Sequence, residues 1–206
     1  MLKLYGRNTS INVQKAAWAM GEAGLEWEWF DKDGVFGTVD VPNYAEINPQ
    51  IRIPTLDDDG LLVRQSNAIV RYIARNYGQE VLLPKDEPTY VEAERWMEWQ
   101  ASDNWRPMVV VFWGLIRTPK GERNMVAIEE CTGILNEQFG LLNDYLADRA
   151  YVTGDTFTMG DIPPGAAVYR YYAMDIERPD YPYLERWYET LQKRETYRDL
   201  VMVLLA

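Results

Sequence analysis

The chain has 206 residues, a formal net charge of −11 and no histidine. A negative field of this size repels nucleic-acid phosphates and anionic lipid, which argues against roles on DNA, RNA or a membrane surface. Without histidine, imidazole-based mechanisms and most zinc sites are excluded, and the single Cys131 can form neither an intrachain disulfide nor a thiolate cluster, so no metal is expected.

The first residues alternate between strand and helix patterns. Residues 2–5 alternate before a glycine, and the segment WEWF at 27–30 is typical of a second short strand. Between them, small and apolar residues recur at helical spacing from Asn12 until Gly24. A loop rich in glycine and aspartate is expected from residue 32 to about residue 43.

A hairpin and a helix complete this first part of the chain. Residues 53–56 and 61–63 predict two strands joined by the turn DDDG at 57–60. An amphipathic helix is expected directly after Ser66. The order β-α-β-loop-β-β-α therefore predicts a small α/β domain over residues 1–80.

The remainder of the chain carries no convincing strand pattern. The polar stretch LLPKDEP marks a linker, assigned to residues 81–87, and an all-α domain is expected over residues 88–206. Pro107 should kink or break the first of its helices, at 89–114. The others are expected near 122–147, 159–174, 181–193 and 195–205.

Three short features of this second part favour structural roles. Cys131 lies on an apolar helical stripe and is expected to be buried. Thr158 and Asp161 have the spacing of a helix capping box. The doublet Pro163-Pro164 follows within the next turn and should remove at least one helical hydrogen bond.

Ile53-Pro54 stands at the head of a predicted strand, where proline has no N–H for the ladder. Two conformations are open: a trans proline that ends the loop, or a cis bond, which X–Pro allows at a cost of ~0.5–1 kcal/mol. With a cis bond, the backbone N–H and C=O of Ile53 would face outward. A peptide-like ligand could then pair with them as an added strand.

Two predicted helix starts carry polar residues that can bind an anion. Ser66 is either a plain N-cap or, at the positive end of its helix, part of a carboxylate site next to Gln65. Thr9, Ser10 and Asn12 are three short hydrogen-bonding residues at the start of the first helix. One of these three is expected to cap the helix, and another could donate to an anion in the same pocket.

Six segments of the chain occur in a characteristic order and spacing: LYGRNTSINVQKAAW, NPQIRIPTLDDDG, QSNAIVRYIARNYG, RWMEWQ, FWGLIRTP and FTMGDIPPG. Taken together, they resemble the bacterial cytosolic glutathione S-transferases of the serine type, which are theta- or beta-like. The resemblance runs from about residue 2 to residue 190. It implies a thioredoxin-like N-terminal domain followed by an all-α C-terminal domain, glutathione as co-substrate, and a cytoplasmic homodimer with a role in detoxification.

The resemblance also implies how glutathione would bind. Ile53, beside Pro54, would pair with the cysteinyl backbone, while Gln65 and Ser66 would hold the γ-glutamyl group. Arg52 would meet the glycyl carboxylate. Asp103 of the partner subunit would lie near the γ-glutamyl amine, or else belong to a solvated helix face.

In serine-type members a hydroxyl near the start of the first helix faces the glutathione sulfur, and Ser10 is the best positional match. Asn12 is the second choice and Thr9 the third. A free thiol has a pKa of about 8.5, and one hydrogen bond to a charged group contributes ~1.5–3 kcal/mol, which suffices to make thiolate the major form near neutral pH. Tyr5 lies inside the first predicted strand, which argues against a tyrosine-type enzyme. No cysteine lies near Ser10, which argues against thiol transfer.

The second substrate is expected to be a small hydrophobic electrophile. Its pocket would use Phe36, Trp113, Arg117 and Tyr169, each of which could equally belong to the core. The same thiolate could reduce an organic peroxide, so transferase and peroxidase activities stay open. The alternative function is a non-catalytic, regulatory relative that binds glutathione or another ligand.

Overall fold

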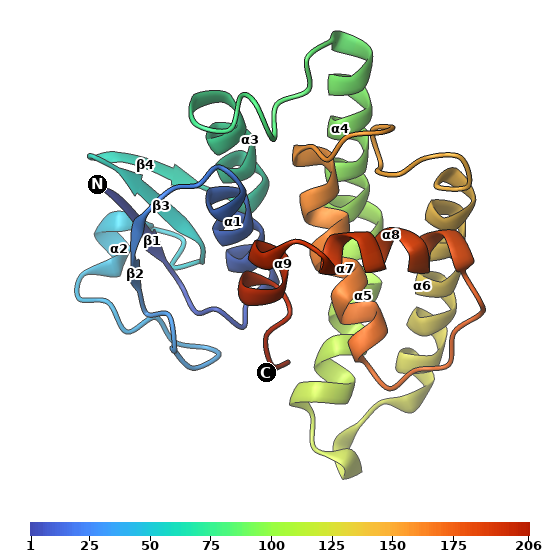
Figure 1. Cartoon of the computed structure of the whole chain (residues 1–206). Coiled ribbons are helices and arrows are strands. Elements are labelled where there is room, and N and C mark those ends of the chain that lie inside the picture. Colours follow the sequence, from blue (N-terminus) through green and yellow to red (C-terminus); the bar gives the residue numbers. More distant parts are fainter. The chain divides into compact units, whose positions relative to one another are not determined.

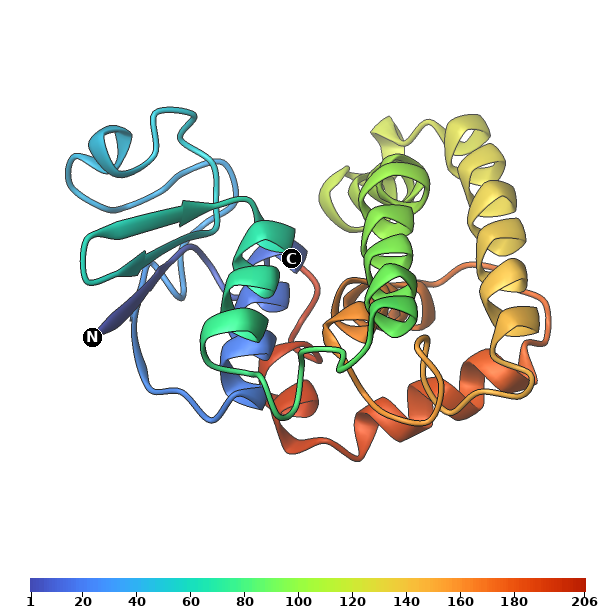
Figure 2. The ribbon, with the colours of Figure 1, turned by 90° about the horizontal axis from the view of Figure 1, so that it is seen from above.

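The computed structural model describes residues 1–206, and the chain forms two compact units. The first unit comprises Met1–Pro84 and Glu195–Leu204, and the second comprises Lys85–Arg194 with the two last residues, Leu205–Ala206. Figures 1 and 2 show the α/β arrangement of the first unit and the helices of the second. No helix has the length and apolar character needed to cross a membrane.

The first unit is built on a four-stranded mixed sheet in the order β2-β1-β3-β4. Helix α1 (Ile11–Glu22) connects the parallel pair β1 and β2, whereas β3 runs antiparallel to both β1 and β4. In the predicted hairpin, Asp59 and Gly60 form the turn. Their φ angles are positive, at 48° and 98°, as a two-residue hairpin turn requires. The strands are β1 (Leu2–Tyr5), β2 (Trp27–Phe30), β3 (Thr55–Asp58) and β4 (Leu61–Arg64).

Helices α1 and α3 (Ser66–Asn76) pack together on one side of this sheet (Figures 1 and 2). Their apolar stripes form the core with Leu4 and Leu56, both of which are fully buried. A short helix, α2 (Tyr44–Ile47), follows directly after the predicted loop. Sequence periodicity could not indicate it, because four residues form little more than one helical turn.

The second unit is all-helical, as predicted. Helix α5 packs against α6, and α7 contacts both α4 and α8. Aromatic side chains fill much of the interior, including the stacked rings of Phe139 and Tyr171, whose centroids lie 4.2 Å apart. The helices are α4 (Glu87–Trp99), α5 (Trp105–Phe112), α6 (Met125–Tyr145), α7 (Ile162–Ala173) and α8 (Pro182–Gln192).

Pro107 does not break the helix in which it lies. A π-helical turn, Gln100–Asn104, joins α4 to α5, and Pro107 is the third residue of α5. Because proline has no N–H, the carbonyl of Asp103 four residues earlier loses its helical donor. That carbonyl instead accepts a hydrogen bond from Nε2 of Gln138, at 2.9 Å. The wide turn and this side-chain donor allow the helical path to continue.

The predicted capping box is confirmed at the 3-10 turn Met159–Asp161 that leads into α7. The hydroxyl of Thr158 accepts from the backbone N–H of Gly160, and the carboxylate of Asp161 accepts from the backbone N–H of Thr158. Pro163 and Pro164 occupy the first turn of α7. Backbone N–H groups in a first turn have no helical partner, so the expected loss of a helical hydrogen bond does not occur.

The expected burial of Cys131 is wrong, because this residue is partly exposed on α6. The buried stripe of that helix runs through Ile128, Leu135, Phe139 and Leu142. Cys131 lies at the flank of this stripe, beside the exposed Glu130. Partial burial, with Glu130 nearby, raises the pKa of its thiol.

The predicted boundary of the C-terminal domain needs one correction. Helix α9 (Glu195–Leu200) belongs to the first unit and packs against α1. The ring of Tyr197 lies 4.7 Å from the ring of Trp18, and both side chains are fully buried. A Cβ atom at Gly21 would come within 2.8 Å of Leu200, so glycine permits this close approach. An apolar pattern shows that a helix packs, but not which domain it packs against.

Candidate functional site

The loop that joins β1 to α1 has a firmly held backbone. The N–H of Gly6 donates to the carbonyl of Phe30 at 3.0 Å, and the N–H of Asn8 donates to the carbonyl of Lys32 at 2.7 Å. From the other side, Nε2 of Gln14 donates to the carbonyl of Asn8 at 2.8 Å. These bonds fix residues 6–10 between the second strand and the first helix.

Gly6 brings this loop against the segment that precedes β3. Its φ angle is +130°, and an added Cβ atom would lie 2.7 Å from the Cβ of Ile53. A side chain is therefore excluded at this position for reasons of both space and backbone conformation. The contact places Ile53 next to the start of α1, so two separately predicted site segments are neighbours.

Ser10 is the N-cap residue of α1, but its side chain does not cap the helix. Its backbone is extended, and its hydroxyl makes no hydrogen bond to the first-turn N–H groups or to any other group of the protein. The residue is only 9% exposed. Because an N-cap serine ordinarily satisfies a first-turn N–H, this hydroxyl is left as a donor for a ligand.

The starts of α1 and α3 meet at one hydrogen bond. The hydroxyl of Ser66 donates to Oδ1 of Asn12 at 3.1 Å. Ser66 is the first residue of α3 and not its N-cap, a position that Gln65 occupies. Of the two interpretations left open for Ser66, the plain N-cap is therefore excluded, and its hydroxyl instead links two helices. Thr9 is partly exposed in the same loop.

Neither of these two helices neutralises its own positive end. No side-chain cap is present at α1 or α3, and neither has an acidic residue in its first turn. Each helix N-terminus carries free N–H groups and about half a positive charge. Two such ends, joined through Asn12 and Ser66, form a site suited to an anionic ligand.

The peptide bond Ile53-Pro54 is cis, which decides between the two conformations left open by the sequence. The backbone N–H and C=O of Ile53 have no hydrogen-bond partner within the protein. The preceding residue is well held, since the carbonyl of Arg52 accepts from the Tyr44 hydroxyl and from Nδ2 of Asn48, both at 2.8 Å. The side chain of Arg52 is exposed.

Gln65 has an unusual backbone for a residue with a side chain. Its φ angle is +72°, and its side chain is exposed directly in front of α3. Such left-handed conformations cost free energy in non-glycine residues and concentrate at ligand sites. Gln65 therefore joins Ser10, Asn12, Ile53 and Ser66 in one part of the first unit.

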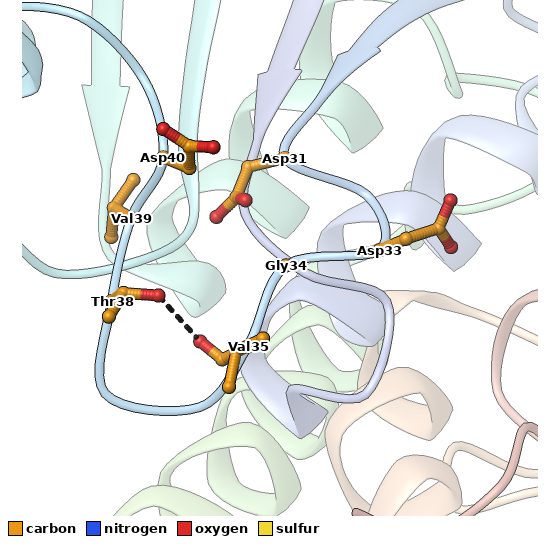
Figure 3. A pocket seen from close by; sticks show the side chains of 7 residues that line it. All are labelled: Asp31, Asp33, Gly34, Val35, Thr38, Val39 and Asp40. Carbon is orange, nitrogen blue, oxygen red and sulfur yellow. Dashed lines mark hydrogen bonds between the residues drawn. The ribbon is translucent and has the colours of Figure 1, made fainter.

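The loop at residues 31–40 borders an open hollow of about 630 Å³. Asp31, Asp40 and Asp33 line it, with Asp33 pointing away from the other two (Figure 3). The hydroxyl of Thr38 donates to the carbonyl of Val35 and closes the tip of the loop. Phe36 lies at this tip with 44% of its surface exposed.

Arg7 is a residue of this region that the sequence interpretation missed. Its guanidinium lies 5.0 Å from the centre of the Phe36 ring, and the residue is only 8% exposed. Burial lowers the pKa of the Arg7 guanidinium, against the opposing effect of the nearby Asp31. The only signal in the sequence is its position directly after Gly6 at the end of β1.

The remaining predicted site residues lie in the second unit. Trp113 is 46% exposed, and Arg117 stacks against its ring at 5.4 Å. Arg117 also donates to the carbonyl of Ala206. Tyr169 is half-buried, and burial raises its pKa. Asp103 is exposed and accepts a hydrogen bond from Ser102.

Fold and candidate site together define a class of protein: a thioredoxin-like domain with two uncapped helix starts, followed by an all-helical domain. The family model "Glutathione S-transferase, N-terminal domain" matches residues 1–75, and "Glutathione S-transferase, C-terminal domain" matches residues 104–195. The chain belongs to the glutathione S-transferase family.

Relatives and solved structures match along the whole chain. Glutathione S-transferase GstB of Escherichia coli is 34% identical over 205 residues, which cover 98% of this chain and 99% of the relative. Glutathione S-transferase 3 of Zea mays is 29% identical, over 97% and 93% of the two chains. A crystal structure of a theta class glutathione S-transferase from Xanthomonas axonopodis pv. citri with glutathione bound matches with a TM-score of 0.94 and 38% sequence identity. The match covers 100% of this chain and 99% of that chain.

Proposed function

We propose that this protein activates glutathione as a thiolate at Ser10 and transfers it to a small hydrophobic electrophile. The observation that carries this proposal is the Ser10 hydroxyl, buried at the uncapped start of α1 and without a partner in the protein. A hydroxyl that served only to cap the helix would bond to a first-turn N–H. Here it is available to the glutathione sulfur.

The energetic requirement for this role is modest. Lowering a thiol pKa from about 8.5 by about 2 units requires about 2.7 kcal/mol. A hydrogen bond to a charged group contributes ~1.5–3 kcal/mol, and the positive end of α1 adds a further favourable interaction. Ser10 is preferred to Asn12 as the donor because it is the N-cap residue of α1 with a buried, unpartnered hydroxyl, whereas Asn12 is partly exposed and lies inside the helix.

The proposed position of glutathione follows the free groups around Ser10. Its cysteinyl backbone pairs with the N–H and C=O of Ile53 beside Pro54, which have no partner in the protein. Its γ-glutamyl carboxylate lies at the start of α3, at Gln65 and Ser66. The glycyl carboxylate is proposed to meet Arg52, whose side chain is exposed.

The second substrate is proposed to contact Phe36, Trp113, Arg117 and Tyr169. Conjugation and peroxide reduction need the same thiolate, and we favour conjugation because the relatives carry the name of transferases. No observation favours a non-catalytic, regulatory role. We also propose a cytoplasmic, detoxifying homodimer in which the partner subunit's Asp103 approaches the γ-glutamyl amine. A monomeric mass in light scattering at micromolar concentration would contradict the dimer.

An ultraviolet difference spectrum tests the activation of glutathione directly. Protein with bound glutathione, titrated from pH 5 to 9, is expected to show thiolate absorbance well below the pH at which free glutathione ionises. The same titration with S-methylglutathione, which has no ionisable thiol, is the control. Binding without thiolate absorbance would favour the non-catalytic alternative.

Ser66→Ala is expected to weaken glutathione binding about tenfold, because the Ser66 hydroxyl would exchange its neutral acceptor Asn12 for the charged carboxylate, and a hydrogen bond to a charged group contributes ~1.5–3 kcal/mol. Isothermal titration calorimetry measures the change. Thr190→Ala is the control, since its hydroxyl also bonds within the protein, to the carbonyl of Arg186, but belongs to α8. If both variants keep the same Kd as the unaltered protein, glutathione does not lie against the start of α3.

A further inference from the structure

The Arg7 side chain is a buried cation without a direct counter-charge. It is 92% removed from solvent, as its 8% exposure shows, and the structure gives its guanidinium neither a hydrogen bond nor an ion pair. Taking a charge out of water without pairing it is costly, and buried charges are ordinarily paired. Selection for stability alone does not explain such a residue, whereas an anionic ligand nearby would.

The surroundings of Arg7 are few and well defined. The Phe36 ring covers the guanidinium, and Asp31 is the one carboxylate with which it has an electrostatic interaction. One oxygen of Asp31, Oδ2, is itself buried and has no hydrogen-bond partner. The neighbouring cation, Lys32, lies instead over the ring of Trp29. Asp31 therefore compensates the charge of Arg7 only from a distance.

Arg7 and Ser10 belong to the same turn. The N–H of Ser10 donates to the carbonyl of Arg7 at 3.2 Å, and Asn8 between them is fixed by its bond to Lys32. Both side chains are about nine-tenths buried, and neither has a hydrogen-bond partner in the protein. One turn of the chain thus presents an unused hydroxyl and an unpaired positive charge.

We propose that Arg7 is a positioning residue that supplies positive charge to the thiolate site and thereby favours the ionised form of glutathione bound at Ser10. The proposal rests on the proposed function. We infer that Arg7 acts through its field, because its Nε is fully buried without a partner and the Phe36 ring lies against its guanidinium. In a water-poor environment one charge acts on another over several ångströms. The exposed Arg52 is the residue suited to direct carboxylate contact.

Three variants test this proposal. In each, the pKa of the thiol of bound glutathione is measured from the thiolate absorbance. Arg7→Met removes the charge and keeps the length of the side chain, and is expected to raise that pKa by about one unit, so that about tenfold less thiolate is present at a fixed lower pH. Arg7→Lys keeps the charge and should leave the thiol pKa nearly unchanged. Asp31→Asn removes the opposing charge and should lower it.

Asp31→Asn removes the charge of Asp31 without straining the backbone. Asp31 has a φ angle of +57°, and asparagine tolerates this conformation well. Thermal unfolding without ligand provides a second measurement. Arg7→Met should unfold at the same temperature as the unaltered protein or higher, because an unpaired buried charge has been removed. If Arg7→Met does not fold, the opposite shift expected of Asp31→Asn still decides the proposal.

The possible failures are distinct. An unchanged thiol pKa in Arg7→Met and in Asp31→Asn overturns the role of Arg7. A weaker affinity for glutathione with an unchanged thiol pKa also overturns it, because Arg7 would then bind a carboxylate. If the unaltered protein binds glutathione but forms no thiolate, the proposed function itself fails, and with it the premise of this inference.

Discussion

Ser10→Ala is expected to lower kcat for a small electrophile by about 10- to 100-fold, with little change in the Kd of glutathione. The hydroxyl of Ser10 has no bond within the protein, so its removal leaves no group of the chain unsatisfied. The variant loses the hydrogen bond to the ionised sulfur of glutathione. Because the ionised sulfur is the species that reacts, kcat falls. Steady-state kinetics with a chromogenic electrophile, together with calorimetric binding of glutathione, separates the two quantities.

Ser10→Thr is the matched control, because it restores a hydroxyl at the same position and should recover much of the activity. Asn12→Ala examines the other donor of the same turn. It breaks the link to Ser66 and should weaken binding more than it lowers turnover. If Asn12→Ala abolishes thiolate formation while Ser10→Ala retains it, the assignment of the donor is wrong.

Asp161→Asn is expected to reduce the free energy of unfolding by about 3 kcal/mol at pH 7. Asp161 is completely buried. Its Oδ1 accepts from the Val152 N–H and the Trp187 indole, and its Oδ2 accepts from the Thr158 N–H, at 3.0 to 3.1 Å. An amide can replace only one of these oxygens as an acceptor, so its NH₂ group would face another N–H donor. Urea denaturation measures the change.

The pH dependence of this effect has a definite sign. Burial raises the pKa of Asp161 to about 6, against the opposing effect of its N–H donors. The folded protein therefore holds this proton more tightly than the unfolded chain, whose aspartates titrate near pH 3.9. The stabilisation that comes from this tighter proton binding at Asp161 is complete below about pH 4. It is lost as the pH rises through about 6. The difference between the unaltered protein and Asp161→Asn should narrow over this interval.

Trp187→Phe provides the comparison, because it removes one donor and leaves both carboxylate oxygens with a backbone partner. Its cost should be clearly smaller than that of Asp161→Asn. Equal stability of Asp161→Asn and the unaltered protein would contradict the prediction, since it would mean that the capping box does not depend on the second oxygen.

Most of the fold follows from local patterns that the sequence displays. The strands at 2–5 and 27–30 and the longer helices are predicted because each spans enough residues for its period to repeat. The failures have identifiable causes. Helix α2 is too short to show a period, and the packing partner of α9 depends on Trp18, far away in the sequence.

The candidate site could be predicted from the sequence where it depends on helix starts. Ser10, Asn12 and Ser66 could be selected because short polar residues before an apolar period mark an N-terminus. Their mutual arrangement was not, since the bond from Ser66 to Asn12 depends on how α1 and α3 pack. Arg7 was missed because its burial depends on Phe36, which a distant loop brings over it. Local composition contains no information on such coverage.

The place of α9 has a consequence for how the chain is made. Trp18 is buried in the first unit with Tyr197 against it, although 178 residues separate them in the chain. During synthesis the sheet, α1 and α3 leave the ribosome early. The face of α1 that packs against α9 stays uncovered until the entire helical unit has been translated. Before then, the side of Trp18 that Tyr197 covers in the folded protein has no partner. A release of the chain before residue 195 would leave this surface exposed permanently.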